Sequence, residues 1–205
     1  MNAQVDQLIR RVEQTQHGFT DILRAAEELA ASESAADRLR LADALYPSPV
    51  PQARALAVYL YGDLAPESEA PLLFLRGVVS RDPNWRVQEI LAQAFDRFCA
   101  ATGYEHALPT IIDWLSDDSP NVRRAVTEGL RIWTSRPYFS DHPADAIALL
   151  SQHRADPSEY LRKSVGNALR DISKQHPDLV RAELARWDVS DKRTKLTHRL
   201  ASKFL

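Results

Sequence analysis

An apolar pattern with helical spacing recurs four times along the middle of the chain. Its copies cover residues 53–61, 87–95, 122–130 and 161–169, so successive copies begin 34, 35 and 39 residues apart. Within each copy the apolar residues share one face of a helix, while polar residues such as Arg123 point elsewhere. Units that recur at this period bury their apolar faces only by stacking on their neighbours. The pattern therefore predicts a protein built of helical repeats.

Helix-starting residues precede every copy. Asp82-Pro83, Ser119-Pro120 and Asp156-Pro157 stand before the second, third and fourth copies, and a Pro-rich break at 46–51 stands before the first. Asp and Ser cap helix N-termini, and Pro is favoured in the first turn. Partner helices are expected at residues 67–80, 104–115 and 144–153. Each repeat is then a helix pair of HEAT-like geometry, although HEAT repeats are usually longer, at roughly 40–47 residues.

These observations predict one all-α domain over residues 1–205, a HEAT-like helical-repeat solenoid with a concave groove. Residues 1–45 contain three amphipathic segments that we expect to cap one end of the solenoid. The repeats fill residues 46–178, and residues 179–205 cap the other end. The sequence shows no strand-like alternation, phosphate-binding glycine loop, metal-ligand cluster or Ser/His/Asp arrangement.

Composition is that of an ordinary globular protein, with 44% hydrophobic and 26% charged residues. The single cysteine, Cys99, lies in an apolar helical context and is expected to be a buried structural thiol. We expect a cytoplasmic protein, because no segment resembles a signal peptide and no apolar run approaches the roughly 18 residues of a membrane span.

Charge is distributed unevenly although the net charge is only −2. Residues 1–80 carry 7 basic and 11 acidic side chains, residues 81–155 carry 8 and 10, and residues 156–205 carry 11 and 7. The final helix contributes Lys192, Arg193, Lys195, Arg199 and Lys203. Those cations form either a solvated face or a surface that meets phosphates.

Equivalent positions on successive second helices should form rows on the concave side. The first row is Arg54, Gln88, Arg123 and Arg162. The second is Ala55, Glu89, Arg124 and Lys163, and a third is Gln93, Glu128 and Asn167. Rows that combine several arginines and lysines with isolated carboxylates would fit an anionic polymer that also carries a positive centre. The alternative is a set of salt bridges within the repeats.

Three phrases resemble the bacterial DNA alkylation repair family, the AlkC/AlkD-type DNA glycosylases with HEAT-like repeats. They are residues 84–89, 122–129 and 160–180, and the likeness covers roughly residues 50–187. The last phrase, which contains Lys174-Gln175-His176-Pro177, is the strongest. Glu128-Gly129 in the middle phrase, and Asn167 where AlkD-type members carry Trp, favour the AlkC branch.

The resemblance implies hydrolysis of the N-glycosidic bond of cationic alkylated purines, such as 3-methyladenine or 7-methylguanine, in duplex DNA. It implies a monomer that needs no metal or cofactor. The carboxylates that match the family pattern are Glu89, Glu128 and Asp171, which would stabilise an oxocarbenium-like sugar and position a water. The implied DNA-binding residues are Trp85, Arg86, Arg123, Arg124, Trp133, Arg162, Lys163 and Asn167.

Several alternatives stay open at this point. Trp85 could staple its repeat, Glu89 could pair with Arg86 or Arg124, and Asp171 could form only a structural hydrogen bond. Trp133 could line the cleft or pack in the core, whereas Trp114 and Trp187 are assigned to packing. For the whole chain, the alternatives are a non-catalytic HEAT-like protein that binds damaged or branched DNA, and a protein-binding HEAT scaffold.

Overall fold

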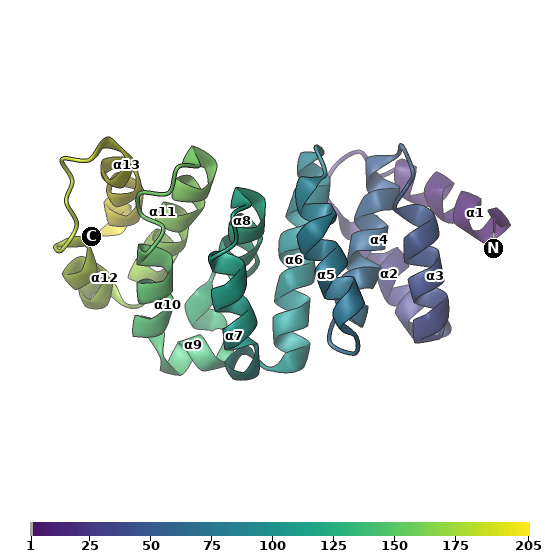
Figure 1. The fold of residues 1–205 in the computed structure, drawn as a ribbon, viewed down its shortest axis with the longest axis horizontal. Coiled ribbons are helices and arrows are strands. Elements are labelled where there is room, and N and C mark those ends of the chain that lie inside the picture. Colours follow the sequence, from purple (N-terminus) through teal and green to yellow (C-terminus); the bar gives the residue numbers. More distant parts are fainter. Residues whose placement is uncertain (1) are drawn as a thin grey trace. The chain divides into compact units, whose positions relative to one another are not determined.

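The computed structural model describes residues 2–205, in which helices are joined by turns and loops and no β-strand is present (Figure 1). The predicted all-α class is confirmed. The chain divides into two compact units, Met1–Ala101 and Thr102–Leu205. The first unit carries 10 basic and 14 acidic side chains and the second carries 16 and 14, so their net charges are −4 and +2.

The first unit holds most of the sequence-predicted capping segments and the first repeats. Its helices are α1 (Asn2–Glu13), α2 (Thr20–Ser32), α3 (Ala35–Leu45), α4 (Pro51–Leu64), α5 (Glu69–Gly77), the 3-10 helix η1 (Val79–Arg81) and α6 (Trp85–Thr102), which ends at the boundary. The three segments expected within residues 1–45 are therefore helices α1, α2 and α3.

Helix α4 forms the core of the first unit. Ala53, Leu56 and Leu60 have no exposed surface, and almost all of the remaining residues between them are buried as well. A helix that is apolar all round must be covered on all sides. Helices α1, α2, α3 and α5 pack against it, and α6 approaches it closely at Gly62.

The second unit continues the pattern of helix pairs. Its helices are α7 (Tyr104–Leu115), α8 (Pro120–Gly129), η2 (Trp133–Ser135), α9 (Pro137–Asp141), α10 (Pro143–Ser151), α11 (Glu159–Ser173), α12 (Pro177–Leu184), α13 (Lys192–Ala201) and η3 (Ser202–Phe204). Helix α11 forms its core through Leu161, Val165 and Leu169, and α8, α10, α12 and α13 pack around it.

The predicted helix starts are confirmed. Helices α6, α8 and α11 begin at Trp85, Pro120 and Glu159, at the capping phrase or within two residues after it, and Ser158 Oγ accepts the Leu161 N–H at 3.3 Å. The segments η2 and α9 were not predicted from the sequence. Cys99 is buried, as expected. No helix in residues 2–205 combines the length and apolar character needed to cross a membrane.

The contact between α4 and α6 generates a stability prediction. A Cβ atom at Gly62 would lie 2.7 Å from Ala94 Cβ and 2.9 Å from Ala94 Cα, so Gly62→Ala should lower the free energy of unfolding by about 1–3 kcal/mol. Gly77→Ala is the control, because nothing lies within 4 Å of its Cβ position; it should be neutral or stabilising by up to about 1 kcal/mol. Urea denaturation measures both, and equal effects would contradict the close approach.

Candidate nucleic-acid interface

The turns that start the repeat helices share one aspartate geometry. The Oδ1 atoms of Asp82, Asp117 and Asp156 each accept the backbone N–H two residues further on, in every case at 2.8 Å. This side-chain hydrogen bond closes an Asx turn. Each turn leaves its backbone carbonyls pointing toward the helix that follows.

In the first unit, side chains of the helices take up those carbonyls. Arg54 Nη1 donates to the carbonyls of Ser48 and Pro49 at 2.9 and 3.2 Å, and Arg54 Nε donates to Asp82 Oδ2 at 2.7 Å. Gln88 Nε2 lies 2.9–3.1 Å from three carbonyl oxygens of residues 79–82. Both side chains thus secure the turn before their own helix, and Arg54 also reaches the next turn.

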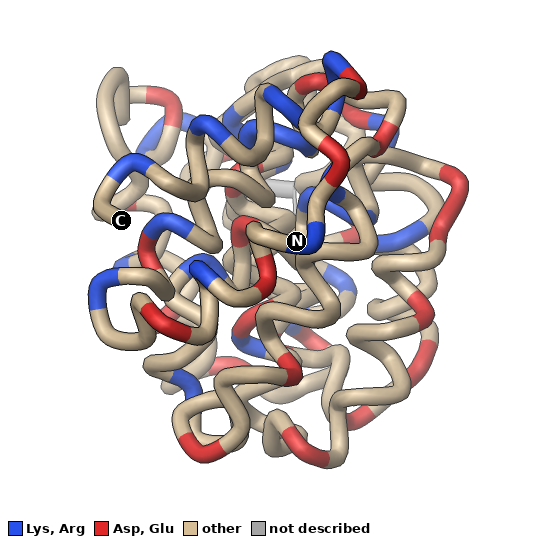
Figure 2. Tube along the Cα trace, turned by 90° about the vertical axis from the view of Figure 1, so that its left-hand side faces the viewer, with Lys and Arg blue, Asp and Glu red and all other residues tan. Residues whose placement is uncertain are grey.

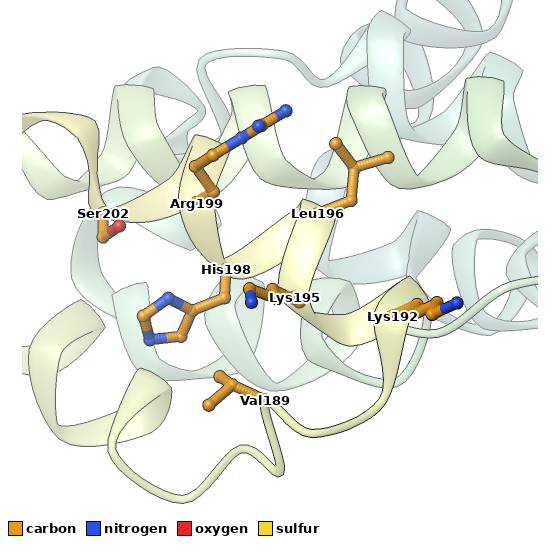
Figure 3. A pocket seen from close by; sticks show the side chains of 7 residues that line it. All are labelled: Val189, Lys192, Lys195, Leu196, His198, Arg199 and Ser202. Atoms are coloured by element: carbon orange, nitrogen blue, oxygen red, sulfur yellow. The ribbon is translucent and has the colours of Figure 1, made fainter.

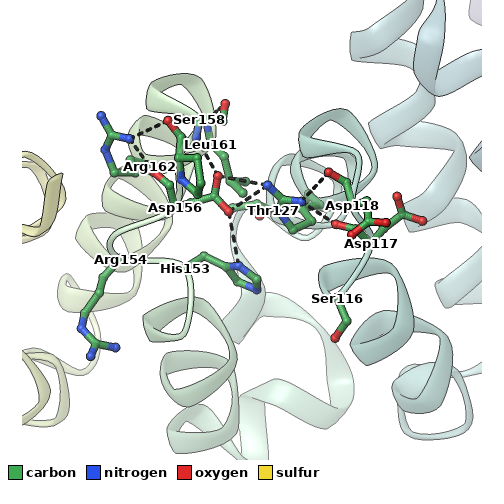
Figure 4. Close-up of polar contacts among 12 residues, drawn as sticks. Ser116, Asp117, Asp118, Thr127, His153, Arg154, Asp156, Ser158, Leu161 and Arg162 are labelled. Atoms are coloured by element: carbon green, nitrogen blue, oxygen red, sulfur yellow. Dashed lines mark hydrogen bonds and ion pairs between the residues drawn. The ribbon is translucent and has the colours of Figure 1, made fainter.

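The second unit repeats this arrangement (Figure 4). Arg123 Nη1 donates to the carbonyls of Asp117 and Asp118, and its Nη2 lies 2.9 Å from Asp156 Oδ2. Arg162 Nη1 donates to the carbonyls of Asp156 and Pro157. We call this set the turn ladder: Arg54, Gln88, Arg123, Arg162, Asp82 and Asp156.

The turn ladder changes the role of two arginines that the resemblance assigned to DNA. Arg162 is 7% exposed, and the Arg123 side chain is 12% exposed. Their donors hold turn carbonyls and Asp156. The first row is therefore structural, as the alternative of internal bridges anticipated, and is not an open phosphate-binding surface.

The two cations of the second row differ in their exposure to solvent. Arg124 is 6% exposed, with its guanidinium carbon 4.3 Å from the centroid of the Tyr160 ring. Lys163 is exposed at the surface, where its Nζ lies 2.7 Å from Glu159 Oε1. Of these two predicted DNA contacts, only Lys163 is accessible.

Trp85 and Glu89 occupy the first two turns of α6. They are four residues apart and hence share one face of the helix. Trp85 is 61% exposed, so it does not staple its repeat. The Arg86 guanidinium lies 5.0 Å from the Trp85 ring centroid and donates to the Gln16 carbonyl. The predicted aromatic and acidic pair is therefore presented on α6.

The position predicted for Trp133 is corrected by the structure. Its indole has no exposed surface and packs edge-on against Phe139, at 4.9 Å between ring centroids. Trp133 lies in η2, beyond the end of α8, which turns its side chain into the core. It therefore lines no surface, whereas Trp114 and Trp187 are buried as predicted.

Two other predicted site residues of the second unit have internal partners. Glu128 Oε1 accepts a hydrogen bond from Ser164 Oγ. Asn167 Oδ1 accepts from Arg170 Nη1 at 3.0 Å. Each is half-buried, and each hydrogen bond fixes a side chain of α11.

Asp171 lies in a pocket of about 530 Å³ among cations. Its carboxylate lies 2.9 Å from Lys174 Nζ, 3.4 Å from Arg170 Nη2 and 3.5 Å from Arg131 Nε. Burial alone would raise the pKa of Asp171, but these three cations outweigh it and hold the pKa below its usual value. The carboxylate is ionised at neutral pH. The lining residues are Arg131, Ile132, Arg170, Asp171, Lys174 and Gln175.

The cations of this pocket were not predicted from the sequence. Arg170 precedes Asp171 in α11 and Lys174 is the C-cap of that helix, a spacing that could have indicated both cations. Arg131 comes from the segment after α8 and had no such signal. Glu89 belongs to the first unit, whereas Glu128 and Asp171 belong to the second. No three His, Cys, Asp or Glu side chains gather to hold a metal ion within residues 2–205.

Residues 9–205 match the family described as DNA alkylation repair enzyme, and the chain belongs to that family. AlkD2 from Streptococcus mutans is 46% identical and superimposes with a TM-score of 0.97, covering 100% of this chain and 98% of that one. The structure of smu.31 from Streptococcus mutans UA159 is 45% identical with a TM-score of 0.92, covering 98% and 99%. These matches confirm the HEAT-like repeat fold.

More distant relatives include a DNA complex. Pseudomonas fluorescens alkylpurine DNA glycosylase AlkC, bound to DNA containing an abasic site analog, is 25% identical with a TM-score of 0.52 over 97% of this chain and 61% of its own. The chain is thus closer to AlkD2, and the inference of the AlkC branch is wrong. YhaZ of Bacillus subtilis (strain 168), an uncharacterised protein, is 36% identical over 87 residues, 40% of this chain and 24% of YhaZ. The match spans about a quarter of that relative.

Arg123 should matter more for stability than its neighbours on α8. Arg123→Ala leaves Asp156, whose side chain is 6% exposed, without its cation, so the free energy of unfolding should fall by roughly 3 kcal/mol. Arg123→Gln should cost less, because Gln88 shows that an amide can hold the turn carbonyls. Denaturant titration ranks the variants. An Arg123→Ala loss no larger than that of Arg123→Gln would contradict this role.

The His153 side chain should make the free energy of unfolding depend on pH. Its Nδ1 lies 3.9 Å from Asp156 Oδ2, but burial lowers its pKa, nearby Arg123 acts in the same direction, and Asp156 offsets them only in part. As pH falls below about 6.5, His153 takes up a proton in the unfolded chain before it does so in the folded protein. The free energy of unfolding therefore decreases until the pH falls below the pKa of His153 in the folded protein. The free energy of unfolding should drop more in wild type than in His153→Asn between about pH 7.5 and about pH 5.5. Parallel pH curves would refute this assignment.

Proposed function

We propose that this protein excises cationic alkylated purines, of the 3-methyladenine or 7-methylguanine type, from duplex DNA by hydrolysing the N-glycosidic bond. The observation that carries the proposal is the pair on α6, an exposed Trp85 one helical turn from Glu89. Membership of the DNA alkylation repair family supports it, as does the relative described as an alkylpurine DNA glycosylase bound to DNA.

The purine base is a good leaving group and needs little assistance from the enzyme. An N-alkylated purine is already cationic, so the bond between the sugar C1′ and the base nitrogen breaks with both electrons going to the base. Positive charge then develops on the sugar, and a carboxylate stabilises it. Glu89 would do so and orient the water whose oxygen bonds to C1′ while its proton passes to solvent. The Trp85 ring would face the cationic base.

The second unit would hold the DNA beside the lesion. Lys163, Arg131 and Lys174 are exposed donors that suit phosphates. Asp171 is an ionised carboxylate among them and holds these cations in place. Such a monofunctional hydrolysis calls for no cofactor, and we expect a monomer that acts on chromosomal DNA in the cytoplasm.

A second candidate is a non-catalytic protein that binds damaged or branched DNA. One observation favours it: two predicted catalytic carboxylates have partners inside the second unit, since Glu128 accepts from Ser164 and Asp171 lies among three cations. Such carboxylates act as structural acceptors without any reaction.

The two candidates differ in a measurement of released base. Purified wild type should release free base from methylated duplex DNA. Glu89→Gln should lower the rate on the order of 10²-fold or more, with DNA affinity nearly unchanged, because the amide keeps the shape of the side chain and removes its charge. The exposed Glu69 of α5 supplies the control Glu69→Gln, which should keep the wild-type rate.

Each other outcome has a distinct meaning. Duplex binding by wild type without release of base would establish the second candidate. Absence of both would leave a protein-binding scaffold. Full release by Glu89→Gln would refute the role of Glu89 while leaving the reaction in place.

A further inference from the structure

Helix α13 presents a row of cations that the proposed function does not use. Lys192, Lys195 and Arg199 are exposed and recur at three- and four-residue spacing, so they share one face of the helix. Figure 3 shows them following one another along α13. Among the residues that the structure describes, none of the three forms an ion pair. Their charge is directed to solvent, in contrast to the arginines of the turn ladder.

This row borders a pocket of about 520 Å³ between α13 and the segment before it. Val189 and Leu196 give the pocket apolar walls, and Val189 is 45% exposed. A pocket that combines cations with apolar walls is complementary to a nucleic-acid backbone, in which charged phosphates alternate with less polar sugars.

The row continues into the pocket of Asp171 through the C-terminal aromatic. The Nζ atoms of Lys203 and Lys174 lie 5.8 and 5.4 Å from the ring centroid of Phe204. Lys203 follows Arg199 by one turn, and Lys174 lines the pocket around Asp171. The basic band is this set of five side chains: Lys174, Lys192, Lys195, Arg199 and Lys203. Figure 2 marks lysine and arginine positions in blue, including those near the C-terminus.

We propose that the basic band extends the phosphate-binding surface of the second unit beyond Lys163 and Arg131, along the backbone of duplex DNA. Charge complementarity carries this inference. Asp171 is the one carboxylate that pairs with a member of the band within the described residues, and Arg123 and Arg162, which the sequence offered for phosphates, are held in the turn ladder. From Lys192 to Lys203 a helix rises about 16 Å, which corresponds to about five base-pair steps along the axis of a duplex. The inference rests on the proposed function, because it assumes DNA as the ligand.

The test is the salt dependence of duplex binding by the full chain, measured by fluorescence anisotropy with an unmodified duplex. Lys195→Gln/Arg199→Gln should reduce the slope of log affinity against log salt by about 2, close to one for each lost phosphate contact. The matched control is Arg181→Gln/Arg186→Gln on α12. It removes the same charge from the same unit, but its arginines already pair with Asp178 and Glu183, so its slope should stay near that of wild type.

The outcomes separate this inference from the proposed function. Equal slopes for the α13 variant and wild type would overturn the basic band and leave DNA as the ligand. Equal reductions by both double variants would also overturn it, because net charge rather than the band would be responsible. No duplex binding by wild type at low salt would overturn both proposals. Unchanged circular dichroism and melting temperature confirm that the variants fold.

Discussion

A guanidinium or amide group that holds the turn before its own helix is the interaction on which the repeats depend. Carbonyls of a tight turn beside a buried helix need a partner other than water. Arg54, Gln88, Arg123 and Arg162 supply it in successive repeats. Arg54 and Arg123 also reach the aspartate of the next turn, so one side chain fixes the start of its own helix and the spacing to its neighbour.

Much of the fold follows from the sequence, because apolar spacing and helix caps act locally. Helices α6, α8 and α11 begin at their capping phrases or within two residues after them. Trp133 could not be placed in this way. Its position depends on α8 ending at Gly129 and on η2 turning the indole toward Phe139, a change of direction with no periodic signal.

The candidate site was less predictable, because polar residues repeat for two reasons. A row of arginines has the same spacing whether it faces phosphates or holds turns, and only the atoms that receive its hydrogen bonds distinguish these roles. The contact between Arg131 and Asp171 could not be predicted either, because no sequence pattern indicates that these two segments meet. Glu128-Gly129 and Asn167 misled the choice of branch, because a few positions carry less information than similarity along the whole chain to AlkD2.

The uneven division of charge between the two units also bears on how the molecule meets its ligand. A unit of net −4 is repelled by a polyanion, whereas one of net +2 is attracted. Long-range attraction therefore acts on the second unit before any contact forms. The first unit, which carries Trp85 and Glu89, must instead gain its affinity from contacts at short range, so salt should slow the encounter with DNA more than it weakens those contacts.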